Sequence, residues 1–138
     1  MPELLTSLII WIAANSNLEH DGAALPRVVM ASAEALHEMA FGENFPKAIR
    51  SGKYKVSGLY NDVENTIYLV DTTDLTTEGG KALLVHELVH YLQHTNGRTK
   101  EHELRVLEPL AYVLEASWLQ ARLYAWREEV ANSVAVGG

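Results

Sequence analysis

Three residues able to bind and use a divalent metal lie together near the middle of the chain. The stretch VHELVHYLQHTNG, residues 85–97, places His86, Glu87 and His90 in an H-E-x-x-H pattern. On a helix, residues four apart share one face, so both imidazoles can reach one ion while Glu87 lies beside them as a general base. The apolar residues on both sides indicate a buried helix, where polar groups without partners are costly. The pattern arises by chance in roughly two or three of every hundred chains of this composition, but its setting favours a metal site.

A third protein ligand is needed, and the histidines nearby do not supply it. His94 continues the four-residue spacing, yet it would lie ~12 Å along the helix axis from His86. We expect it to be an exposed residue at the helix end. A metzincin would have glycine and histidine where this chain has Gln93 and Asn96. The later stretch EHEL looks like a second motif, but Val106 stands where its second histidine belongs.

The acidic residues that follow are the third-ligand candidates. Glu108 comes eighteen residues after His90, which leaves room for a loop and an antiparallel return. Because Pro109 disfavours helical geometry in the residue before it and is tolerated in a first turn, a second helix is expected to begin near Glu108. There the helix dipole favours an ionised carboxylate. Glu101 and Glu115, seven residues to either side, are alternative ligands. Solvated surface charge is the commoner fate of any glutamate.

The stretches HELVH and EPLAY together resemble the gluzincin metallopeptidases, in particular their smallest members, the minigluzincins. In that family the third ligand is a glutamate that begins an E-x-x-A stretch on the next helix. The resemblance implies a Zn²⁺ ion held by His86, His90 and Glu108, with Glu87 as the general base. It extends from residue 54 to the second helix, about half the chain. The implied fold is a small α+β, zincin-like domain with a short sheet packed on the motif helix.

Two further site assignments follow from this resemblance. Tyr112 lies one turn after Glu108 on the same face, and it is the hypothesis for an oxyanion donor; half-buried helix packing is the alternative. The strand candidate NTIYL looks like the edge strand along which such enzymes bind an extended peptide by β-augmentation. Thr66, Ile67 and Tyr68 are therefore expected to bind substrate.

Three nitrogen or oxygen ligands with an open fourth position describe a catalytic zinc rather than a structural one. The expected function is zinc-dependent hydrolysis of peptide bonds, by an endopeptidase rather than an exopeptidase, with a peptide or protein as substrate. The alternative is a catalytically silent or latent zincin-like domain that binds another protein. A third reading is a core domain without metal. The sequence does not indicate a cleavage specificity.

The elements that must position these residues alternate between helix and strand. The first half is expected to hold an amphipathic helix around residues 5–12, a strand around residues 28–30, and a helix capped by Ser32 and closed by Gly42. Two β-rich runs then flank the turn NDVEN as a hairpin, Tyr54–Tyr60 and Thr66–Val70.

Two long helices complete the expected order. The motif helix runs from about Glu78 to His94, capped by Thr76 or Thr77 and ended by Asn96 and Gly97. The last helix runs from about Arg105 to Asn132. One apolar stripe of this helix is expected to face the core: Leu107, Ala111, Leu114, Trp118 and Ala121. The prediction is a single α+β domain over residues 1–138.

Composition narrows the function classes further. With 48% apolar and 21% charged residues, the chain can close one core. Its net charge of −7 and the lack of a basic stripe argue against nucleic acid and anionic membranes as partners. The absence of cysteine excludes thiolate ligands, disulfides and thiol nucleophiles. The apolar run from Leu8 to Ala14 is too short to span a bilayer and no basic residue precedes it, so a cytoplasmic location is expected. A homo-oligomer is compatible with the sequence.

Overall fold

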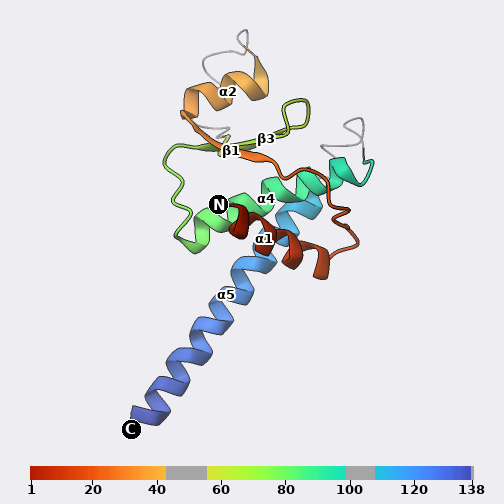
Figure 1. Cartoon of the computed structure of the whole chain (residues 1–138). Helices are drawn as coiled ribbons and strands as arrows, with labels where there is room; N and C mark the ends of the chain where they lie inside the picture. The colour runs from red at the N-terminus through yellow and green to blue at the C-terminus, as the bar shows by residue number, and fades with distance from the viewer. Residues whose placement is uncertain (43–55, 99–107, 138) are drawn as a thin grey trace.

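A computed structural model of the chain describes residues 1–42, 56–98 and 108–137 (Figure 1). The elements in these residues confirm the α+β class, with helices and a three-stranded sheet. In chain order they are α1 (Pro2–Ala14), β1 (Arg27–Ala31), α2 (Ala33–Phe41), β2 (Gly58–Asn61), β3 (Thr66–Val70), α4 (Glu78–Thr95) and α5 (Glu108–Gly137). Within the described residues, no helix combines the length and the apolar character needed to cross a bilayer.

The sheet has the order β1-β3-β2. β2 and β3 form the predicted antiparallel hairpin, with Leu59 opposite Tyr68. The first predicted β run is shorter than expected, because residues 56 and 57 lie outside the strand and residues 54 and 55 lie outside the described residues. Asn65, with φ of 47°, makes the tight reversal before β3. β1 pairs in parallel on the other side of β3, with Val29 opposite Tyr68.

The expectation that Thr66, Ile67 and Tyr68 form an edge strand is wrong. β3 is the middle strand, so its backbone groups are hydrogen-bonded to β1 on one side and to β2 on the other. Thr66 and Ile67 are fully buried. The physical reason is the long-range pairing of β1 with β3: β1 is a predicted strand, but no local pattern in the sequence specifies its partner.

The core is built around α4, with the sheet on one side of this helix and α1 and α5 on the other. In Figure 1 the sheet lies over α4, with α2 above the sheet and α1 and α5 on the far side of α4. One contiguous cluster of buried apolar side chains joins α1, β3, α4 and α5. The predicted inner face of α1 is confirmed, since its buried residues are those expected: Leu5, Leu8, Ile9 and Ile12. The motif helix is therefore the central element of the molecule.

The ends of α4 are set by local chemistry. Thr77, one of the two predicted caps, accepts a hydrogen bond from the backbone N–H of Gly80. Gly80 cannot carry a side chain, because a Cβ there would lie 1.9 Å from the carbonyl oxygen of Asp74. At the other end Asn96 is the C-cap and Gly97 takes a φ of 77°, as the sequence indicated.

α5 differs from its prediction in length and in packing. Its described part begins at Glu108 and continues to Gly137, beyond the expected end at Asn132, while residues 105–107 lie outside the described residues. Ala111, Leu114 and Trp118 are buried as expected. Ala121 is exposed, which corrects the predicted stripe. The first three turns of α5 pack on α4, and the remainder projects from the body (Figure 1).

Candidate metal centre

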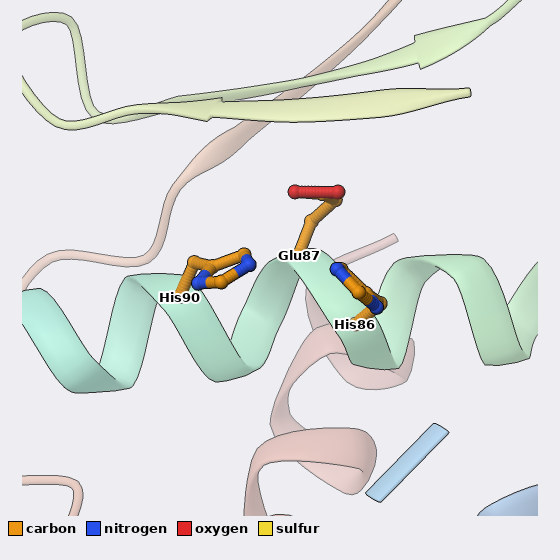
Figure 2. A group of neighbouring side chains, drawn as sticks. All are labelled: His86, Glu87 and His90. Atoms are coloured by element: carbon orange, nitrogen blue, oxygen red, sulfur yellow. The ribbon is translucent and has the colours of Figure 1, made fainter. Parts of the chain in front are cut away.

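α4 presents the three motif residues together at the centre of its buried length. His86 and Glu87 are 7% and 4% exposed, and each of the three side chains has a potential ligand atom within 4.8 Å of the others. In Figure 2 the carboxylate of Glu87 points from the helix toward the strands that cross above it. The two imidazoles lie to either side of that carboxylate, with their ring centroids 5.1 Å apart. This is the shared face that the four-residue spacing predicted.

Glu108 closes the group from the first turn of α5. Its Oε1 lies 2.9 Å from Nε2 of His86 and 2.5 Å from Nε2 of His90. Of the three glutamates left open by the sequence, the structure therefore brings Glu108 to both imidazole nitrogens. Glu101 lies outside the described residues.

The opposite ring nitrogens have their own partners. Nδ1 of His86 lies 2.8 Å from Oε1 of Glu115, and Nδ1 of His90 lies 2.9 Å from Oε1 of Gln93. A carboxylate and an amide oxygen only accept hydrogen bonds, so both Nδ1 atoms carry the proton and donate it. When an imidazole is neutral, its lone pair is therefore on Nε2, the atom that faces Glu108. Glu115 is thus a residue that orients His86, and it is not placed as a ligand.

The carboxylates around His86 and His90 favour a positive charge between them. Burial tends to lower the pKa of His86, but the hydrogen bond that His86 donates to Glu108 and the charge of Glu87 raise it to about 9. The pKa of His90 is raised against burial in the same way. Hydrogen bonds from the two imidazoles hold the pKa of Glu108 well below its usual range. If a Zn²⁺ ion replaced the protons on the two Nε2 atoms, two imidazole nitrogens and a carboxylate oxygen would face it, and this donor set fits zinc.

Glu87 lies next to the two histidines, and the pKa of its carboxylate is raised. Burial raises its pKa to about 7, against the lowering effect of His86 and His90. The backbone of β2 passes directly over the carboxylate, since a Cβ at Gly58 would lie 2.9 Å from Oε2 of Glu87. A buried carboxylate with a pKa near the working pH suits a general base.

Tyr112 lies at the rim of the same group. Its ring packs edge-on against His86, with the centroids 4.6 Å apart, and the residue is 60% exposed. Burial and the charges of Glu108 and Glu115 raise the pKa of its hydroxyl. The ring contacts His86 on one side and most of the side chain faces solvent, so Tyr112 is more exposed than the half-buried packing of the alternative.

These residues line a cleft of about 710 Å³ between β2, α4 and α5. His94 also lines the cleft, but it contacts the carboxylate of Asp62 at 3.6 Å and is half exposed, as expected for a residue at the helix end. Gln93 and Gly58 were not singled out by the sequence. The position of Gln93, three residues after His90, was a usable signal, whereas the contact of Gly58 with Glu87 depends on tertiary structure alone.

Comparison with known proteins adds one result. No curated protein and no solved structure matches the chain. A family model described as a domain of unknown function (DUF6647) matches residues 1–130, which is nearly the whole chain. The chain belongs to this DUF6647 family.

Proposed function

We propose that this chain is a small zinc-dependent peptidase that resembles the gluzincins. One observation carries the proposal: Oε1 of Glu108 meets the Nε2 atoms of His86 and His90, while both Nδ1 atoms are engaged by other side chains. Such outer hydrogen bonds fix the orientation and tautomer of metal-binding histidines. A zinc ion held by these three residues would keep a fourth position for water or substrate, which is the feature of a catalytic site.

The residues around the ligands support hydrolysis rather than metal storage. When bound, zinc would lower the pKa of its water ligand and polarise a substrate carbonyl. Glu87 would take a proton from the attacking water at its carboxylate and return it to the departing amine. The hydroxyl of Tyr112, on the exposed rim beside His86, would donate to the developing oxyanion.

The substrate strand of this proposal is β2 in place of β3. Among the described residues, β2 has β3 on one side only, and its residues Gly58 to Tyr60 line the cleft beside the motif helix. An extended peptide can therefore pair with the free edge of β2, with its carbonyl over Glu87. The expectation of an endopeptidase over an exopeptidase rests on the resemblance to gluzincins and on no feature of the cleft. We also propose a cytoplasmic location, which the lack of cysteine favours.

The test combines metal content with turnover. Purified protein should contain one zinc per chain by elemental analysis and should cleave an unfolded protein in a reaction that a chelator stops. Glu87→Gln should keep the zinc and lose cleavage. Protein without zinc would overturn the proposal at its first step. Stoichiometric zinc with no cleavage of any unfolded substrate would favour the alternative, a silent or latent zincin-like domain that binds a protein.

A further inference from the structure

The distal half of α5 carries an apolar stripe that nothing in the described structure covers. Every described side chain from residue 119 to residue 131 is exposed, and the helix projects from the body (Figure 1). Leu119, Leu123, Trp126 and Val130 are between 37% and 59% exposed. At ~100° per residue these four side chains fall in one narrow strip of the helix surface. A continuous apolar strip of this kind on a soluble chain indicates an interface.

The spacing of the stripe is that of a coiled coil. Its residues follow one another at intervals of four, three and four, which are the alternating core positions of a heptad repeat. The buried residues that hold α5 to α4, Ala111, Leu114 and Trp118, lie on a different face. The stripe is therefore not an extension of the chain's own core, and it fits a second helix.

The charges beside the stripe select the orientation of that second helix. In an antiparallel pair of identical helices, Leu119 lies opposite the partner's Val130 and Leu123 lies opposite the partner's Trp126. This register places Arg122 beside the partner's Glu129. By symmetry Glu129 lies beside the partner's Arg122, so the flank that carries these two residues has two pairs of opposite charges.

The other arrangements are less favourable. A parallel pair in the same heptad would place Arg122 beside the partner's Arg127, and these like charges repel. A helix that lies on an anionic membrane is rich in Lys and Arg on its polar face. Here the charged residues of the segment, Arg122, Arg127, Glu128 and Glu129, sum to zero, and the whole chain has a net charge of −7.

We propose that two copies of this chain associate through the distal halves of α5 as an antiparallel two-helix coiled coil, with two Arg122–Glu129 pairs along one flank. The assembly is self-complementary and closed by a two-fold axis, the commonest symmetry of soluble oligomers. It does not depend on the metal centre, so the two proposals can fail separately.

Sedimentation velocity of the full chain, from low to high micromolar concentration, tests the assembly. A reversible monomer–dimer equilibrium is expected. Arg122→Glu and Glu129→Arg should each weaken the dimer by about tenfold, because both attractions between the helices become repulsions. The double variant, which exchanges the two charges, should restore it. Since Arg122 also lies over the Trp118 ring at 5.0 Å, Glu129→Arg is the cleaner single change.

Glu128→Arg is the matched control, because it makes the same charge change one residue earlier, on a face away from the stripe. It should leave the dimer unchanged, and circular dichroism should show equal helix content in all variants. A chain that stays monomeric at all concentrations overturns the proposal and indicates that a different protein binds the stripe. A dimer that ignores the single reversals, or one that Arg122→Glu strengthens, overturns the antiparallel register.

Discussion

The two glutamates of α5 that reach His86 should differ in what their loss does to zinc binding. Glu108 faces Nε2 of both histidines, whereas Glu115 contacts only Nδ1 of His86. Glu108→Ala removes a ligand, and Glu115→Ala removes only the acceptor that orients one imidazole. We therefore expect both variants to bind zinc more weakly, with Glu108→Ala much the weaker of the two.

The size of each effect can be worked from the structure. Loss of a hydrogen-bond partner behind a metal-binding histidine typically costs about 10–100-fold in metal affinity, or about 1.4–2.8 kcal/mol. The side chain of Glu115 is 28% exposed, so water can replace part of its role, and the lower end of that range is expected. Glu108→Ala should exceed about 100-fold and leave no stoichiometric zinc after gel filtration.

The assay is a titration of chelator-treated protein with zinc in competition with a fluorescent indicator. Glu115→Gln keeps an acceptor oxygen for Nδ1 and should recover most of the affinity. Glu128→Ala, on an exposed turn of the same helix, should bind zinc like the unchanged chain. The opposite order, with Glu115→Ala losing zinc and Glu108→Ala keeping it, would refute the assignment of the ligand.

Three further changes test the rest of the site and its helix. Gly58→Ala should displace the buried carboxylate of Glu87 by tenths of an ångström and lower kcat with zinc retained. Gly79→Ala, at a position with open space around it, should leave kcat unchanged. Equal turnover in the two variants would contradict the close approach of Gly58 to Glu87. Tyr112→Phe should reduce kcat by about 100-fold with the same zinc affinity, measured by initial rates on an unfolded substrate, and near-normal turnover would dismiss its role. Thr77→Ala should lower the free energy of unfolding by about 1 kcal/mol in urea, because the cap on Gly80 is lost; Thr77→Ser should retain it, and equal stability of both variants would contradict the capping role.

Local signals in the sequence predicted the motif helix well. The cap at Thr77, the Asn96–Gly97 end and the shared face of His86 and His90 all depend on residues within one or two turns of each other. The role of Glu108 could also be predicted from the sequence, because Pro109 indicates the start of a helix and the loop length allows an antiparallel return. These features follow from short-range geometry, which a single sequence displays.

The errors arose where distant segments meet. β3 was taken as an edge because its pairing with β1 joins residues 39 apart, as in Arg27 opposite Thr66, and nothing local specifies that contact. The contact of Gly58 with Glu87 was invisible for the same reason. Ala121 continues the face of Ala111, Leu114 and Trp118, but α5 has left the body of the domain at that point, and periodicity alone does not tell where a helix loses its contacts.

α5 is one unbroken helix, with Glu108 in its first turn and the apolar stripe toward its far end. Its 30 residues form a stiff rod of about 45 Å. A partner bound at the far end of α5 therefore restricts the angle between α5 and α4, and with it the position of the Glu108 carboxylate beside the two histidines. Zinc binding and dimer formation are then thermodynamically coupled. The factor by which zinc changes the association constant of the dimer equals the factor by which dimer formation changes the zinc affinity. Sedimentation with and without a chelator would read that factor directly.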